Sequence, residues 1–410
     1  MRNSFKRALA LLIAIACALA GSFAAFARSP AQAQEAVLAY LTVNATAPAV
    51  SFTGGEWAIF ALARSGATVP SGYYDGYLSR VRQTLQSTDG VLSPATEYAR
   101  VAIALSALGE DAASFHGHNL LLPLADFNEV TAQGINGAIF ALIAFDTRNW
   151  AVPEIADEQA QASRQRLIDF ILSREIAGGG FAMNPMAGTA TADVTAMALQ
   201  ALAPYRTQPA VAAAIDRALA LLPGLPLANA GDAAQAIVAL ATLGVSPAGL
   251  PLDSLLALQQ PNGSFFHVAA GTGNRQMATE QAAYALVAYD RFLGNQTALH
   301  DMSDVAPRAQ LDIARTAKIS AIQAVTYGLN QADYTVESWN ALLGAMNHAI
   351  ARVNSLFNIE AINAVEIPPA NGLIERPAQP QPPMWWESPP LPAWLHFLLR
   401  YLFFGWIWMS

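Results

Sequence analysis

The stretch Trp57-Ala-Ile-Phe-Ala-Leu62 is the first of six copies of one pattern, in which small and apolar residues lead into an Ala-Leu pair. The final leucines of the copies are 37 to 57 residues apart, at Leu62, Leu105, Leu142, Leu199, Leu240 and Leu286. A recurrence of this period is typical of repeat architectures, in which each unit has an apolar face that only a neighbouring unit can bury. The pattern therefore predicts a scaffold of stacked helical units.

A second set of helical segments alternates with these copies, one before each Ala-Leu helix. The Ala-Leu helices are apolar nearly all round, which predicts burial on every side, whereas the second set is amphipathic. We expect the second set near residues 34–43, 72–87, 112–123, 156–174, 208–221 and 250–260. Six buried helices alternating with six amphipathic ones predict an all-α fold, a closed α/α toroid with six inner and six outer helices at residues 34–306.

The order of signals within one unit resembles a known repeat. A helix, a Gly-rich turn such as Ile176-Ala-Gly-Gly-Gly-Phe181, and then a Thr-Ala-containing Ala-Leu helix are similar to the repeat of squalene and terpene cyclases and of protein prenyltransferase β subunits. The cobalamin carriers have a related toroid. Residues 193–202 and 277–289 resemble stretches of bacterial exported proteins described as containing prenyltransferase/squalene oxidase repeats. This resemblance covers about residues 35–305 and implies the fold rather than an activity.

The N-terminus has the features of a secretory signal peptide, since basic residues precede a short apolar run at 8–20. Small residues offer cleavage after Ala27 or Ala33, and we favour Ala33, so that the signal peptide is 1–33, because a helix-like pattern starts at Glu35. An uncleaved anchor and a lipoprotein site at Cys17 are the alternatives. Cys17 is the one cysteine of the chain, so a mature protein without residues 1–33 has no thiol.

The charge balance excludes one class of partner. The chain carries 22 Lys and Arg against 30 Asp and Glu, a net charge of -8. Every charged residue in 1–33 is basic, so loss of this segment makes the net charge more negative. Because binding to nucleic acid depends on Lys and Arg that neutralise phosphates, we expect no nucleic-acid partner. A hydrophobic content of 54% with 13% charged residues fits a chain that buries a large helical core.

The C-terminal part departs from the repeat. Residues 307–366 are predicted to form two longer helices, 309–328 and 336–357, as a FIVAR-like extension on the resemblance of Tyr334-Thr-Val-Glu-Ser-Trp339, or as a helical pair docked on the toroid. Residues 367–393 form a proline-rich linker.

Residues 394–410 are aromatic and apolar, and a helix over 394–409 would be about 24 Å long, shorter than the roughly 30 Å hydrocarbon core. We predict a membrane-facing tail that lies in or on a membrane surface, with spanning and docking on protein as alternatives. The two ends of the chain together predict an exported protein of the cell envelope, associated with the membrane on its extracytoplasmic side.

The candidate site follows from the expected toroid. Its inner helices begin around one opening, toward which their N-termini direct partial positive charge. Acidic, amide and aromatic residues gather near these predicted helix starts, and we expect a ligand-binding mouth made of Glu56, Trp57, Glu97, Tyr98, Gln133, Asn136, Phe181, Asn184, Asp193, Asp232, Gln235, Phe265, His267, Glu280 and Gln281. The alternative is local: acids cap helices, the two phenylalanines plug turns, and the amides bond neighbouring helix ends.

The motif residues argue against two activities that the resemblance implies. Class II terpene cyclases carry Asp-x-Asp-Asp-Thr-Ala, whose middle acid protonates an alkene with the support of neighbouring carboxylates. Here Asp193 keeps that middle position, but Thr191 and Val194 replace the other two acids. Prenyltransferases bind zinc through Asp, Cys and His, and the mature chain has no Cys. The six histidines show no metal-ligand spacing, so we predict no metal and no resident cofactor.

We therefore expect a non-catalytic binding protein whose toroid mouth binds an amphipathic small molecule or an envelope partner protein. Kinship with the cobalamin carriers makes a corrinoid one candidate ligand. A divergent terpenoid cyclase-type enzyme acting through Asp193 is the first alternative, and a structural or assembly module is the second.

Overall fold

The computed structural model describes residues 28–377, apart from Phe52, Pro185, Ala187 and Asn274, together with Leu395. Within these residues every regular element is a helix and no strand occurs, which confirms the all-α prediction. Residues 28–324 and 346–367 form one compact unit, and residues 325–345 and 368–377 belong to a second. The expected signal-peptide core, residues 378–393 of the linker and the apolar tail lie outside the described residues, Leu395 excepted.

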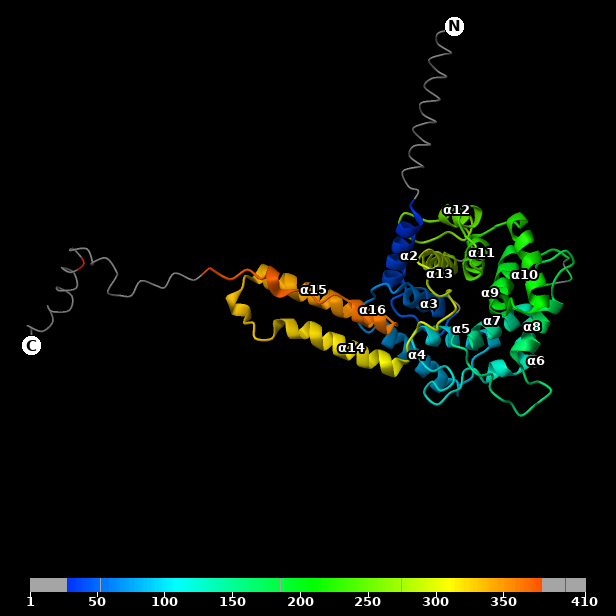
Figure 1. Cartoon of the computed structure of the whole chain (residues 1–410), viewed down its shortest axis with the longest axis horizontal. Coiled ribbons are helices and arrows are strands. Elements are labelled where there is room, and N and C mark those ends of the chain that lie inside the picture. Colours follow the sequence, from blue (N-terminus) through cyan, green and yellow to red (C-terminus); the bar gives the residue numbers. More distant parts are fainter. Residues whose placement is uncertain are drawn as a thin grey trace, which may run out of the picture. The chain divides into compact units, whose positions relative to one another are not determined.

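All six Ala-Leu copies form helices of the first unit (Figure 1), namely α3 (Glu56–Ser65), α5 (Ala95–Ala107), α7 (Gly134–Asp146), α9 (Ala192–Leu202), α11 (Ala230–Thr242) and α13 (Arg275–Leu293). Residues 56–64 of α3 and 98–107 of α5 are all buried, as their apolar circumference predicts. Each of these helices contacts the next one in chain order, and α13 contacts α3. We call these six the six-helix cycle, because their contacts run in a closed sequence.

The second set of helices is present at five of its six expected places, as α2 (Pro30–Asn44), α4 (Tyr73–Ser87), α8 (Arg164–Ser173), α10 (Pro209–Leu221) and α12 (Leu250–Leu256). These helices bury one face only; α8, for example, buries Leu167, Ile168 and Ile171. The expected start of α8 at residue 156 was too early, because Ser163 caps the helix by accepting a hydrogen bond from the Arg166 N–H at 3.1 Å.

The helix expected at residues 112–123 was wrong. His116 and Gly117 adopt left-handed φ angles of 50° and 87°, which a helix does not accommodate, and Phe115 pairs with His118 in an isolated bridge. Only a 3-10 turn, η1 (Pro123–Ala125), and the five-residue helix α6 (Phe127–Thr131) follow before α7.

The first described helix starts earlier than expected. Ser29 and Gln32 form a capping box in which the Ser29 hydroxyl accepts from the Gln32 N–H at 3.3 Å and the Gln32 side chain accepts from the Ser29 N–H at 3.0 Å. Ala33 is fully buried, and its carbonyl accepts from Gln259 at 2.8 Å. Cleavage after Ala33 would remove this first turn, so the preference for Ala33, which depended on a helix start at Glu35, loses its basis. Cleavage after Ala27 would leave the turn intact.

Between α13 and residue 377, the described chain forms three further α-helices, α14 (Arg308–Gln323), α15 (Val336–Asn354) and α16 (Ile359–Ala364). The first two lie close to the predicted 309–328 and 336–357. Within the second unit, Tyr334 bridges Glu375 and stacks on Trp339 with ring centroids 6.0 Å apart. Among the described residues, none of the helices combines the length and the apolarity that crossing a bilayer requires.

Candidate functional site at the N-terminal ends of the six-helix cycle

Glu56 opens α3 and is completely buried. Its Oε2 accepts from Arg100 Nε of α5 and from the Ser51 N–H, both at 3.3 Å, and its Oε1 accepts from the Tyr77 hydroxyl of α4 at 3.4 Å. Burial raises the pKa of Glu56 to about 7, although Arg100 acts to lower it. The carboxyl group therefore links three helices and titrates near neutral pH.

Glu280 occupies the place where the cycle closes, between α13 and the segment before α3. Its Oε1 accepts from the Gly54 N–H at 2.6 Å and from Gln276 at 2.7 Å, whereas its buried Oε2 has no hydrogen-bond partner. Burial raises the pKa of this carboxyl group. Glu97, the third predicted acid of this region, pairs with Arg100 at 3.1 Å and is partly exposed.

Asp193 and Asp232 begin α9 and α11. Asp232 forms a capping box with Asn229, accepting from the Asn229 N–H at 3.2 Å, and also accepts from the Ala228 N–H at 2.8 Å. Burial and then the charge of Asp193 raise the pKa of Asp232, so the two carboxyl groups lie within electrostatic range. Asp193 itself is half-buried. Local capping thus accounts for Asp232, as the alternative interpretation predicted.

Side chains bridge the middle of the cycle. The Trp57 ring of α3 lies 5.8 Å from Phe140 of α7 and 5.7 Å from Tyr284 of α13, between centroids. Gln235 of α11 donates to the Tyr284 hydroxyl at 2.6 Å and accepts from Gln200 of α9 at 2.9 Å. Helices α3 and α7 are not successive, so Trp57 reaches across the cycle. Aromatic and amide groups from five helices therefore meet inside the cycle.

Several other predicted mouth residues have local roles. Gln133 accepts from the Thr96 N–H at 2.8 Å and so caps α5, and the Tyr98 hydroxyl donates to the Gly90 carbonyl at 3.1 Å. Phe181 and Phe265 are fully buried, and their backbone N–H groups donate to threonine hydroxyls of α9 and α13 at 3.0 and 2.9 Å. These contacts match the local alternative.

The remaining predicted residues keep polar atoms near solvent. Asn136, His267 and Gln281 are half-buried and Asn184 is exposed. His267 takes part in helix capping through its backbone, because its carbonyl accepts from the Ala230 N–H at the start of α11, at 2.8 Å. A role of these four side chains and Asp193 in ligand binding stays a prediction.

The opposite ends of the helices are covered by residues 297–305. Arg64 of α3 donates to the Leu299 carbonyl at 3.0 Å and to Asp304 at 2.7 Å, and Arg291 of α13 donates to Asp304 at 2.8 Å. These residues were not among those predicted from the sequence. The sequence feature that could have identified them is Arg64 within an apolar helix, because a buried guanidinium group requires hydrogen-bond partners.

A cavity of about 480 Å³ lies at this covered end, where α7, α9 and α11 finish. Asp146 in its wall accepts from Arg164 at 2.7 Å and from the Tyr205 hydroxyl at 2.8 Å. His300 stacks on Phe60 with centroids 5.1 Å apart, and its Nδ1 is buried without a partner. Burial, followed by the charge of Arg64, lowers the pKa of His300 to about 3.

The described residues contain no group of three His, Cys, Asp or Glu side chains arranged to hold a metal ion. Comparison of the chain with protein-family models, with curated proteins and with solved structures found no match.

Proposed function

We propose that this chain is an exported, non-catalytic binding protein of the cell envelope, built as an α/α toroid of the prenyltransferase/squalene oxidase repeat type. The closed sequence of contacts among α3, α5, α7, α9, α11 and α13 supports the toroid. The ligand is an amphipathic small molecule, with a corrinoid as one candidate, or an envelope partner protein. Recognition takes place at the N-terminal ends of the cycle, through the polar side chains near solvent there.

The observation that carries this proposal is the set of aromatic and amide contacts inside the cycle. A cyclase needs an apolar chamber large enough to enclose its substrate, on the scale of several hundred Å³. Trp57, Gln235 and Tyr284 instead meet across the cycle and are each at most 8% exposed. A ligand at this end therefore contacts the rim. The cyclase alternative depends on Asp193 alone.

Thermal unfolding of the purified chain with a panel of corrinoids and isoprenoids tests the proposal, with native mass spectrometry to detect retained ligand. We expect one class to raise the midpoint, and Asn136→Ala or Gln281→Ala to weaken that effect. Gln165→Ala is the matched control, because Gln165 is exposed on α8, outside the cycle. Stabilisation by none of the panel would remove the small-molecule form of the proposal.

The competing enzymatic function has its own test. Purified chain is incubated with squalene or geranylgeranyl diphosphate, and the products are analysed. We expect no conversion. Cyclised product that disappears in Asp193→Asn would establish catalysis and overturn the non-catalytic proposal.

A further inference from the structure

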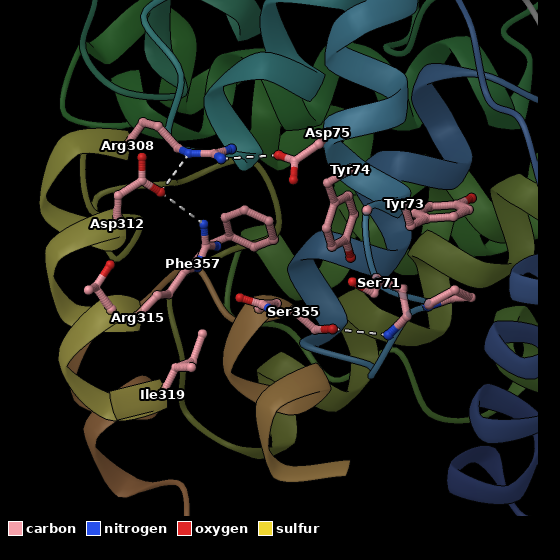
Figure 2. Close-up of a pocket in the computed structure, with 15 residues that line it drawn as sticks. Ser71, Tyr73, Tyr74, Asp75, Arg308, Asp312, Arg315, Ile319, Ser355 and Phe357 are labelled. Atoms are coloured by element: carbon pink, nitrogen blue, oxygen red, sulfur yellow. Dashed lines mark hydrogen bonds and ion pairs between the residues drawn. The ribbon is translucent and has the colours of Figure 1, made fainter. Parts of the chain in front are cut away.

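A second, polar cavity of about 290 Å³ lies in the first unit, and none of the predicted mouth residues lines it (Figure 2). Its walls come from residues 69–75 at the start of α4, from residues 308–319 of α14 and from residues 354–357 after α15. Tyr74 lies between Tyr73 and Phe357 in this wall, with centroids 5.5 and 5.0 Å away. None of these residues was predicted from the sequence to have a role in a site.

Two buried donors in this wall have no partner within the protein. Tyr74 is 5% exposed, and its hydroxyl makes no hydrogen bond. Arg315 is 7% exposed and donates through Nη2 to the Leu356 carbonyl at 2.7 Å, but its buried Nε has no partner. A buried donor left unsatisfied costs about 1–3 kcal/mol, so such groups are typically paired. Both point to an acceptor supplied from outside the chain.

Both arginines in the wall are paired with carboxylates, and Arg308 also contacts Glu110, which lies outside the wall, at 3.3 Å. Arg308 contacts Asp75 at 3.0 Å and Asp312 at 2.8 Å, and Arg315 lies 3.6 Å from Asp312 (Figure 2). An anion would face two carboxylates and a cation two guanidinium groups, so neither is favoured. The arginine contacts of Asp75 and Asp312 all use Oδ1, and both side chains are more than half exposed.

The wall therefore presents donors and acceptors side by side, next to an aromatic surface. A hydroxyl group is the common ligand group that both donates and accepts. At about 30 Å³ per water in the liquid, the cavity holds about ten water-sized groups, the scale of one sugar ring with its hydroxyls.

We propose that this cavity binds a neutral polyhydroxyl ligand the size of one monosaccharide unit. Ligand oxygens accept from Arg315 Nε and the Tyr74 hydroxyl, and ligand hydroxyls donate to Asp75 and Asp312. This site is independent of the rim in the proposed function, and either can fail without the other.

The test uses saturation-transfer NMR on the full chain with four free sugars: glucose, galactose, mannose and N-acetylglucosamine. Inorganic phosphate and putrescine are the charged comparison probes. Their binding is measured by titration, through changes in the backbone amide chemical shifts. We expect at least one sugar to bind and neither charged probe to compete with it.

Variants connect binding to the cavity. Tyr74→Phe removes only the unpartnered hydroxyl, so we expect affinity for the sugar to fall about tenfold while the thermal midpoint is kept or rises. Arg315→Lys removes Nε and should weaken binding similarly. Tyr205→Phe is the control, because Tyr205 lies outside this cavity and its hydroxyl already donates to Asp146 at 2.8 Å, and it should leave affinity unchanged.

Three results would overturn the proposal. The first is that none of the four sugars binds the full chain. The second is that binding is equal in wild type, Tyr74→Phe and Arg315→Lys, which would place the sugar elsewhere. The third is that phosphate or putrescine binds in a Tyr74-dependent manner, which would make this a site for a charged ligand.

Discussion

Glu56 shows how a single buried carboxyl group couples the fold to pH. Its pKa of about 7 in the folded chain lies above the ordinary value of 4.5, so the folded state holds the proton more tightly than the unfolded state. The stability that this group contributes is complete below about pH 4.5 and is lost as the pH rises through 7. The loss is about 3 kcal/mol, since each pKa unit corresponds to about 1.4 kcal/mol.

We predict that Glu56→Gln removes this dependence. Urea unfolding at pH 5 and pH 8 should show that the free energy of unfolding of wild type falls with pH relative to the variant by about 2–3 kcal/mol. Glu97→Gln is the control, since Glu97 pairs with the same arginine but is partly exposed. A parallel response of wild type and Glu56→Gln would contradict the prediction.

His300 acts in the opposite direction. Its folded pKa of about 3 lies below the ordinary 6.5, so its stabilising contribution is present above pH 6.5 and is lost as the pH falls through the window between these values. His300→Gln should therefore make the chain less sensitive to acid, by about 1 kcal/mol between pH 6.5 and 5 after allowance for partial exposure.

The measurement is the same urea series at pH 6.5 and pH 5, with His348→Gln as the control because His348 is exposed on α15. Equal acid sensitivity of wild type and His300→Gln would show that the imidazole is not held neutral by its surroundings. Between pH 6.5 and 4.5, acidification increases the contribution of Glu56 to the free energy of unfolding and decreases that of His300. The wild-type pH dependence is the sum of the two contributions, and only the single variants separate them.

At this scale the sequence indicated which acids begin helices but not what they contact. Capping by Asp232 is local and was one of the two interpretations. The partner of Glu56 lies 44 positions away and that of Arg64 240 positions away. Such pairs depend on how helices are placed in space, which local periodicity does not contain.

Among the elements, α2 provides the sharpest test of the N-terminal boundary. We predict that a chain starting at Arg28 is more stable than one starting at Gln34 by about 2–3 kcal/mol, because the shorter chain loses the capping box, the buried Ala33 and its bond to Gln259. Thermal unfolding of the two proteins measures the difference.

Ser29→Ala in the longer chain serves as the control, and losing only the cap should cost about 1 kcal/mol. Equal midpoints for the two starts would show that residues 28–33 contribute nothing. On the proposal of export, the same reasoning predicts that the secreted protein begins at Arg28, which N-terminal sequencing can establish.

Element prediction succeeded where periodicity and packing agree. The six Ala-Leu helices are buried over most of their residues and were identified from their pattern alone. The helix predicted at 112–123 is absent because Leu120 and Leu121 are buried from an irregular path, which has a left-handed backbone at His116 and Gly117. Apolar spacing reports burial, and a helix is only one way to achieve it.

In the molecule as a whole, the closing contact between α13 and α3 distinguishes a closed cycle from an open stack. An open array has two end units, each with one neighbour, and a local defect spreads mainly to adjacent repeats. The repeat pattern predicted that the units stack, and the residues near the expected helix starts predicted a mouth with aromatic and amide groups. Which side chains cross the middle, such as Trp57 onto Phe140, depends on rotamers and helix orientation that the pattern does not specify.

We predict that a defect on one side of the cycle loosens the opposite side. Leu199→Ala in α9, where Leu199 is fully buried, should destabilise the chain by about 2–5 kcal/mol and raise amide hydrogen exchange in α3 and α13 as well as in α11. Hydrogen exchange with mass spectrometry measures this helix by helix. Val43→Ala, on a side chain that is 72% exposed, is the control and should change none of them. A closed cycle transmits the loss of stability in both directions, so that it reaches both α13 and α3. Faster exchange confined to α7, α9 and α11 would therefore mean that the contact of α13 with α3 contributes little to cooperativity.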